Sequence, residues 1–318
     1  MFIYSRILKE FVSFILMKIK KVIFLGGNRF NESGPMTSFV EVCKERNIES
    51  MVLSNSSRLD YPVNSEQSLR DSLQDLNINF LEDNDVTLDL LEEHIDDETI
   101  IFSVNCEVII KANLINFMPN RIFNYHNASL PTQKGASSHS WRIMQDNKLS
   151  HLTIHHLTEE VDSGEIVLER EVVFPNSVKN LKETYKYIEM EEIKLFDDFV
   201  NIFEDGLSKK VKPVKNLKSF YWPRLNTDID GFVSWHWSAK EIVDFCNAFD
   251  EPFDGASSYI KGSRVRLKNV QTDDEDIYFH PYQFGLVYRK NENSIWIACK
   301  DGGIKVNDVI KEEGFTIK

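Results

Sequence analysis

Short apolar runs alternate with stretches of helical periodicity through the first 150 residues, and this alternation constrains the fold more than any other feature. Residues 22–25 are continuously apolar and end in Gly26 and Gly27, as expected of a buried parallel strand that enters a tight turn. Strands that alternate with helices predict βαβ units, so we expect an α/β domain with a mostly parallel sheet. Further short runs, with helical patterns between them, lie at 50–53, 78–81, 99–104 and 122–125.

The pattern changes after residue 149. Two longer alternating segments, 152–157 and 166–174, flank a turn-like stretch and predict an antiparallel pair of strands. Asn180, with Glu183 three residues later, predicts the capped start of a long amphipathic helix, and Gly206 suits its end.

The composition of the chain shifts near residue 206. Residues 207–218 hold five lysines and Pro213 without an apolar period, which is typical of a linker. One helical pattern and several short strands with turn signals follow, and they predict a smaller OB-like β domain. We therefore expect an N-terminal extension, an α/β domain, a linker and an OB-like domain, at 1–20, 21–206, 207–238 and 239–318.

The N-terminus and the cysteines bear on the compartment. The apolar stretch 11–17 is too short to span a bilayer and no small-residue cleavage site follows it. We therefore expect no membrane association, and translation could start at Met1 or at Met17. The four cysteines are scattered and form no CxxC pair, which favours reduced thiols and a cytoplasmic location.

The net charge of −13 counts against a general nucleic-acid binder, which needs a basic surface to displace counterions from phosphates. The acidic excess lies in residues 1–206, with 20 basic and 34 acidic residues, whereas residues 207–318 hold 17 and 16. Small anionic ligands are not excluded, because local dipoles and a few side chains can hold them.

Asn124 and His126 are the strongest candidates for chemistry. They end a predicted strand, and ligands of open parallel sheets bind outside the carboxyl ends of the strands. Alternation puts both side chains on one side, where a carboxamide and an imidazole could stabilise an oxyanion in acyl transfer. Asp162, in a predicted turn, could orient His126. The alternative is a hydrogen-bonded loop cluster without a catalytic role.

Other candidates are weaker. Gly27 and Asn28 lie in a glycine turn that matches no standard phosphate-binding motif; it is either a backbone cradle for substrate or only a tight turn. Tyr221 and Trp222 could stack on a nucleotide base or anchor the linker. We expect no metal, because the nearby histidines lack a matching cluster of ligands. Those histidines are His151, His155 and His156.

Several spaced motifs together resemble the formyltransferase family that uses 10-formyltetrahydrofolate. The interval of 36 residues between His126 and Asp162 is similar to the spacing in that family. The motifs are Asn124-x-His126, Pro131, Gly135, Thr153-Ile154-His155, Asp162-Ser163-Gly164-Glu165-Ile166, Ile229-Asp230-Gly231-x-Val233-x-Trp235 and Pro252-Phe253-Asp254-Gly255-Ala256.

The resemblance implies a Rossmann-like catalytic domain, formyl transfer from 10-formyltetrahydrofolate to an amine, and no metal. It assigns catalysis to Asn124, His126 and Asp162, with either His126 or a water as the base. It also implies that backbone groups in two segments bind the pterin. These segments contain Val108, Ile109 and Ile110, and Thr158, Glu159 and Val161.

Two departures from the family pattern bear on the acceptor. Asn105-Cys106-Glu107 stands where the family often has aromatic and basic residues, and 129–135 lacks the usual tyrosine. With the acidic first part of the chain, these changes favour a nucleotide-linked amino-dideoxy sugar, destined for a surface polysaccharide such as a lipopolysaccharide O-antigen. The alternatives are a methionyl-tRNA formyltransferase and a catalytically silent folate-binding protein. The OB-like domain could supply the face of a homodimer.

Overall fold

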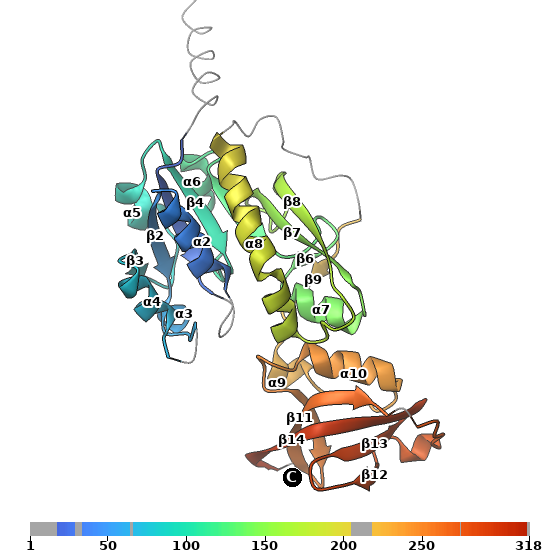
Figure 1. The fold of residues 1–318 in the computed structure, drawn as a ribbon. Coiled ribbons are helices and arrows are strands. Elements are labelled where there is room, and N and C mark those ends of the chain that lie inside the picture. The colour runs from blue at the N-terminus through green and yellow to red at the C-terminus, as the bar shows by residue number, and fades with distance from the viewer. Residues whose placement is uncertain (1–17, 29–33, 64–65, 205–217, 274, 317–318) are drawn as a thin grey trace, which may run out of the picture. The chain divides into compact units, whose positions relative to one another are not determined.

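The computed structural model describes residues 18–28, 34–63, 66–204, 218–273 and 275–316 (Figure 1). Most of the expected N-terminal extension and residues 207–217 of the expected linker lie outside the described residues. The chain forms two compact units. The first comprises residues 1–134, 151–172 and 188–221, and the second comprises residues 135–150, 173–187 and 222–318.

A seven-stranded sheet in the order β3-β2-β1-β4-β5-β7-β8 organises the first unit. Neighbouring strands from β3 to β5 run parallel, and β7 runs antiparallel to β5. The predicted mostly parallel sheet is therefore confirmed. Its strands are β1 (Lys21–Gly26), β2 (Glu49–Ser54), β3 (Asn79–Glu82), β4 (Thr99–Val104), β5 (Ile122–His126), β7 (Leu149–His156) and β8 (Ile166–Val173).

Two helices, α2 (Pro35–Glu45) and α8 (Leu181–Glu204), pack on one face of this sheet (Figure 1). Phe39 of α2 stacks on Phe196 of α8 with ring centroids 4.5 Å apart. Buried phenylalanines from three strands and both helices form this side of the core, namely Phe24, Phe39, Phe102, Phe123, Phe196 and Phe199.

The opposite face of the sheet carries an aliphatic cluster. Side chains of a strand alternate between the two faces, so this cluster takes the residues between the phenylalanines. It includes Ile23, Leu25, Ile101, Ile110, Leu114 and Ile122, and Val108 and Leu157 pack against it. The remaining helices of the first unit are α3 (Ser56–Leu59), α4 (Leu69–Asp75), α5 (Leu88–Leu91), η1 (Glu92–His94) and α6 (Ala112–Phe117).

Gly26 ends β1 with φ +107°, a conformation that residues with a side chain rarely adopt. A Cβ there would also lie only 2.7 Å from the backbone nitrogen of Cys106. Glycine at this position therefore lets the chain after β1 approach the chain after β4.

The second unit contains a five-stranded antiparallel sheet in the order β10-β11-β14-β13-β12, as expected of an OB-like β domain. Its strands are β10 (Ala256–Ile260), β11 (Ser263–Thr272), β12 (Val287–Lys290), β13 (Ile295–Cys299) and β14 (Gly302–Thr316). This unit also contains α7 (Ser138–Met144), α9 (Thr227–Asp230), α10 (Ala239–Ala248), η3 (Pro281–Gln283) and the first residues of α8.

Two helices begin with reciprocal capping hydrogen bonds, and the first of these starts, at Asn180, was predicted from the sequence. The Asn180 side chain accepts from the Glu183 N–H at 3.0 Å, and the Glu183 carboxylate accepts from the Asn180 N–H at 3.3 Å. Ser238 and Glu241 make the same reciprocal capping at α10. None of the helices within the described residues combines the length and the apolar character that crossing a membrane requires.

Candidate active site

Asn124 and His126 project from the same face of β5, because they are two residues apart on one strand. His155 of β7 lies directly opposite Asn124 in the antiparallel register, so it joins them on that face. The intervening residue, Tyr125, faces the helices, where its hydroxyl donates to Glu192 at 2.5 Å. The register of β5 and β7 therefore gathers three polar side chains.

Asp162 comes to the same face from the loop between β7 and β8. Its backbone is left-handed, with φ 49°, a conformation in which Asp is more frequent than most residues. One carboxylate oxygen lies 3.8 Å from His126 Nδ1, and the other lies 3.6 Å from His155 Nε2. These distances are longer than hydrogen bonds, and each contact becomes an ion pair only when the histidine is protonated. Catalytic contacts are often this long in proteins without bound substrate.

Gly164 allows this loop to close against β7. Its backbone lies so close to β7 that a Cβ at this position would overlap the carbonyl oxygen of His156. Any side chain at residue 164 would displace the loop and would move Asp162 with it. The Asp-Ser-Gly order in the sequence therefore has a steric reason at its glycine.

The hydrogen bonds of His155 define its tautomer. Its Nδ1 lies 2.8 Å from the carbonyl oxygen of His156, which can only accept, so Nδ1 carries a proton. Its Nε2 lies 3.1 Å from the Asn124 amide nitrogen, which can only donate, so Nε2 is the acceptor. In this tautomer His155 orients the Asn124 carboxamide, whose second N–H remains available for a ligand.

From the sequence, His155 was a weak candidate for a metal ligand and part of the motif that resembles the family, whereas in the structure it hydrogen-bonds the Asn124 carboxamide. The motif Thr153-Ile154-His155 could have pointed to His155, but the pairing of its strand with the strand of Asn124 was not readable from the sequence. Among the described residues, no group of three or more His, Cys, Asp or Glu side chains is arranged to hold a metal ion.

His126 is 7% exposed, and burial lowers the pKa of its imidazole, with an opposing contribution from Asp162. Its Nε2 lies 2.7 Å from the carbonyl oxygen of Gln133, so Nε2 carries a proton. In the neutral ring, the lone pair is therefore on Nδ1, the nitrogen that faces Asp162. A proton taken up there would lie between the imidazole and the carboxylate.

The two segments expected to bind the pterin border this face. Val108 lies within the first segment and Leu157 directly precedes the second, and both pack on the aliphatic cluster of this face. Ile110 is buried, whereas Ile109 and Val161 are 71% and 46% exposed. Thr158 and Glu159 are also exposed. A flat heterocycle could pack on the two exposed side chains while its polar edges bond to the backbone, and contact of the folate with these segments remains a prediction.

Residue Glu107, one of the departures from the family pattern, forms an ion pair of 2.6 Å with Arg58 of α3. Both line a small cavity of about 20 Å³ at the carboxyl ends of β1, β2 and β4. A cavity of this size holds no more than a water molecule. The basic group at this edge of the sheet is thus supplied by α3.

The expected substrate contacts divide into two groups. Asn28 is buried, and its side-chain oxygen accepts from the Thr37 N–H in the first turn of α2 at 3.2 Å. The Gly27 carbonyl accepts from the Asn105 side chain. Tyr221 is 66% exposed and Trp222 is half-buried in β9 (Tyr221–Trp222), which pairs with β6 (Lys134–Gly135). Substrate contact by these four residues remains a prediction.

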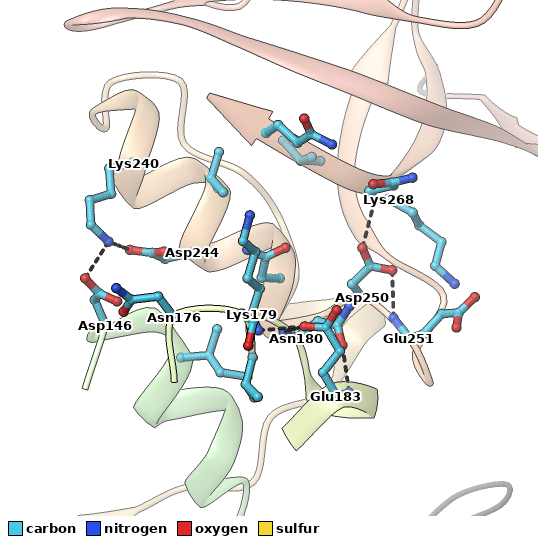
Figure 2. Close-up of a pocket in the computed structure, with 18 of the residues that line it drawn as sticks. Asp146, Asn176, Lys179, Asn180, Glu183, Lys240, Asp244, Asp250, Glu251 and Lys268 are labelled. Carbon is cyan, nitrogen blue, oxygen red and sulfur yellow. Dashed lines mark hydrogen bonds and ion pairs between the residues drawn. The ribbon is translucent and has the colours of Figure 1, made fainter. Parts of the chain in front are cut away.

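The second unit contains a cavity of about 1350 Å³ (Figure 2). Elements around it include α7, α10, β11 and the start of α8. Lys240 bridges Asp146 at 2.8 Å and Asp244 at 2.7 Å, and Asp250 accepts from the N–H of Asn269 at 2.8 Å (Figure 2). The cavity lacks histidine, and many of its charges pair with one another, so we do not place the reaction there.

Comparison with known families identifies the chain. Residues 37–196 match the family model described as formyl transferase, and residues 226–318 match the one described as formyl transferase, C-terminal domain. The chain belongs to the formyl transferase family. The resemblance to the formyltransferase family that the sequence motifs showed is therefore confirmed.

Curated relatives of this formyltransferase are distant. It is 22% identical over 208 residues to a bifunctional polymyxin resistance protein ArnA of Wigglesworthia glossinidia brevipalpis, covering 65% of this chain and 30% of that protein. It is 25% identical over 193 residues to a methionyl-tRNA formyltransferase of Polynucleobacter asymbioticus, covering 60% of this chain and 57% of that protein. The match thus spans less than two thirds of either relative.

Solved structures share the fold of this formyltransferase. WlaRD, described as a sugar 3N-formyl transferase in the presence of dTDP and 5-N-formyl-THF, has a TM-score of 0.65 at 21% identity, covering 94% of this chain and 99% of that one. An N-formyltransferase from Helicobacter canadensis, in complex with folinic acid and dTDP-3-aminofucose, has a TM-score of 0.64 at 19% identity, covering 92% and 100%.

Proposed function

We propose that this formyltransferase moves the formyl group of 10-formyltetrahydrofolate to the amine of a nucleotide-linked amino-dideoxy sugar. The observation that carries the proposal is the convergence of Asn124, His126, His155 and Asp162 on one face of the sheet. The expected location is the cytoplasm, and the expected use of the product is in a surface polysaccharide.

The cosubstrate supplies an activated formyl group when it is bound. In the reaction, a bond forms between the acceptor amine and the formyl carbon, and the bond from that carbon to the folate nitrogen breaks. The amine loses a proton and the departing nitrogen gains one. The chain must therefore stabilise negative charge on the formyl oxygen and carry a proton between two nitrogens.

Asn124 would donate an N–H to the formyl oxygen, and the contact of its amide with His155 supports this role because it fixes the amide plane. His126 can hold the proton on Nδ1, and the carboxylate of Asp162 stabilises the imidazolium that results. The geometry supports His126 as the base better through Nδ1 than through Nε2, because the Gln133 carbonyl occupies Nε2.

The charge distribution supports a small acceptor over a tRNA. Residues 1–206 carry 34 acidic and 20 basic residues, and a strongly acidic catalytic domain repels a polyphosphate backbone. The two solved formyltransferase structures of like fold that carry dTDP or a dTDP-sugar agree with this choice.

A panel assay tests the function. The purified chain is incubated with 10-formyltetrahydrofolate and either dTDP-linked 3-amino and 4-amino dideoxyhexoses, a GDP-linked amino sugar, or initiator tRNA charged with methionine. We expect formylation of at least one sugar, detected by a mass increase of the sugar nucleotide. Formylation of tRNA alone would show that the acceptor is the charged tRNA and not a sugar. Folate binding without turnover on any acceptor would favour the silent folate-binding alternative.

A further inference from the structure

Lys134 connects the loop that carries Asp162 to the strand that follows the catalytic histidine. Its backbone N–H donates to the carbonyl of Phe220 at 3.0 Å, which anchors the residue in the β6–β9 pair. Its ammonium group donates to the Ser163 hydroxyl and lies 3.3 Å from a Glu160 carboxylate oxygen. The lysine side chain is only 12% exposed.

The contact with Ser163 is consistent with the remaining hydrogen bonds of the loop. The Ser163 hydroxyl donates to the carbonyl of Val161 at 3.1 Å, so its lone pairs are the groups that accept from Lys134. This chain of hydrogen bonds runs through the residues on both sides of Asp162. The ammonium therefore holds the backbone on which the Asp162 carboxylate is presented.

The residue before Lys134 contacts the catalytic histidine. The Gln133 carbonyl accepts from His126 Nε2 at 2.7 Å, and the Gln133 side chain accepts from the Ser129 N–H at 3.2 Å. Residues 133 and 134 share one peptide unit. Its carbonyl accepts from His126, and its N–H, on the other side of the unit, donates to the Phe220 carbonyl. A rotation of this peptide would thus disturb His126 and the Lys134 side chain together.

We propose that Lys134 is a positioning residue for formyl transfer: it fixes the loop of residues 158–163 to the peptide that orients His126. Lys134 thereby sets the distance between the His126 imidazole and the Asp162 carboxylate, and it orders the backbone expected to bind the folate. The inference rests on the proposed function for its catalytic consequence. Its structural part, the control of His126 by Lys134, does not depend on the identity of the acceptor.

The loop needs such an external contact because it contributes little to the core. Thr158, Glu159 and Glu160 are exposed, and Asp162 has a left-handed backbone that costs conformational energy. The Glu160 half of the contact is weak, because its side chain is 79% exposed and water screens the pair. The less exposed contact with Ser163 therefore carries most of the effect.

The test compares Lys134→Met, Lys134→Arg, Glu160→Gln and Lys20→Met. Lys20 is the matched control, because it pairs with Glu98 at 2.6 Å and its side chain is 63% exposed, just before the amino end of β1. Urea unfolding establishes that each variant is folded. Steady-state kinetics with the formyl donor and NMR titration of the His126 ring in the ligand-free protein provide the two readouts.

We expect Lys134→Met to raise KM for 10-formyltetrahydrofolate about tenfold and to lower the pKa of His126, because the Asp162 carboxylate moves away. Lys134→Arg should restore most of the wild-type KM and of the wild-type pKa of His126. Glu160→Gln should change KM less than twofold and shift the pKa of His126 less than Lys134→Met does. Lys20→Met should leave both quantities unchanged. An unchanged His126 titration in folded Lys134→Met would overturn the proposal, as would equal damage by the arginine variant. The His126 titration needs no turnover and therefore tests the role of Lys134 by itself. Failure of the proposed reaction would be seen separately, as wild-type protein that formylates none of the acceptors.

Discussion

His155 Nε2 lies 3.1 Å from the amide nitrogen of Asn124, across the antiparallel pair of β5 and β7. The proton on His155 Nδ1 is held by the carbonyl of His156, so the ring is fixed in the form that accepts at Nε2. One of the two Asn124 N–H bonds is thereby used for orientation, and the other can be directed at the formyl oxygen.

We therefore expect His155→Gln to lower kcat 10- to 100-fold with little change in folding, because the amide of Asn124 loses its fixed partner. His151→Gln is the matched control, since His151 lies on the same face of β7 and its Nε2 lies 4.0 Å from a carboxylate oxygen of Glu171. Single-turnover rates with the formyl donor in excess measure the effect. Equal losses in both variants would assign the effect of His155 to the strand as a whole.

Asn124→Ala removes the proposed oxyanion donor, and Asp162→Asn removes the carboxylate that stabilises protonated His126. Each substitution should reduce turnover by about two orders of magnitude or more, the usual consequence of losing such a group. Circular dichroism and binding of folinic acid serve as controls for the fold and the folate site. Near wild-type turnover in either folded variant would remove that residue from the mechanism.

The pH dependence of turnover follows from the shifted pKa of His126. Burial lowers this pKa below the ordinary histidine value of 6.5, so the ring is neutral at pH 7 and can accept a proton. The acid limb of kcat/KM should therefore lie below pH 6.5. Asp162 raises the pKa, so the residual activity of Asp162→Asn should retain an acid limb at still lower pH. A limb that moves upward in this variant contradicts the assignment of His126 as base.

His156 should make stability depend on pH. Its ring packs on Phe123, its buried Nδ1 has no hydrogen-bond partner among the residues that the structure describes, and burial lowers its pKa from 6.5 to about 4. Since the unfolded state takes up the proton more readily, this stability is fully present above pH 6.5 and is lost as pH falls towards 4. The shift corresponds to a loss of up to about 3 kcal/mol at 1.36 kcal/mol per pKa unit.

His156→Phe removes the titrating group and keeps a ring against Phe123. The free energy of unfolding of this variant, measured in urea from pH 7 to pH 4, should fall less steeply than that of the wild type. Parallel curves for the two proteins would show that other groups, such as His126, cause the acid sensitivity.

Much of the fold was readable from local patterns. The apolar run at 22–25, the further short apolar runs and the alternation in 152–157 predicted strands that the structure confirms within a few residues. The capping pair Asn180 and Glu183 also formed as predicted. These features depend on periods of two or 3.6 residues and on side chains three residues apart, so they are present in any window of the sequence.

The candidate site was readable only in part. The sequence by itself determined that Asn124 and His126 share a side of their strand, because alternation along a strand is local. Only the tertiary structure decided that His155 faces Asn124, that the Gln133 carbonyl holds His126 and that Lys134 holds the Asp162 loop. These contacts join segments 7 to 31 residues apart, and they depend on the register between β5 and β7 and on the path of two loops. Such relations arise from packing of the whole sheet, which no single stretch of sequence encodes.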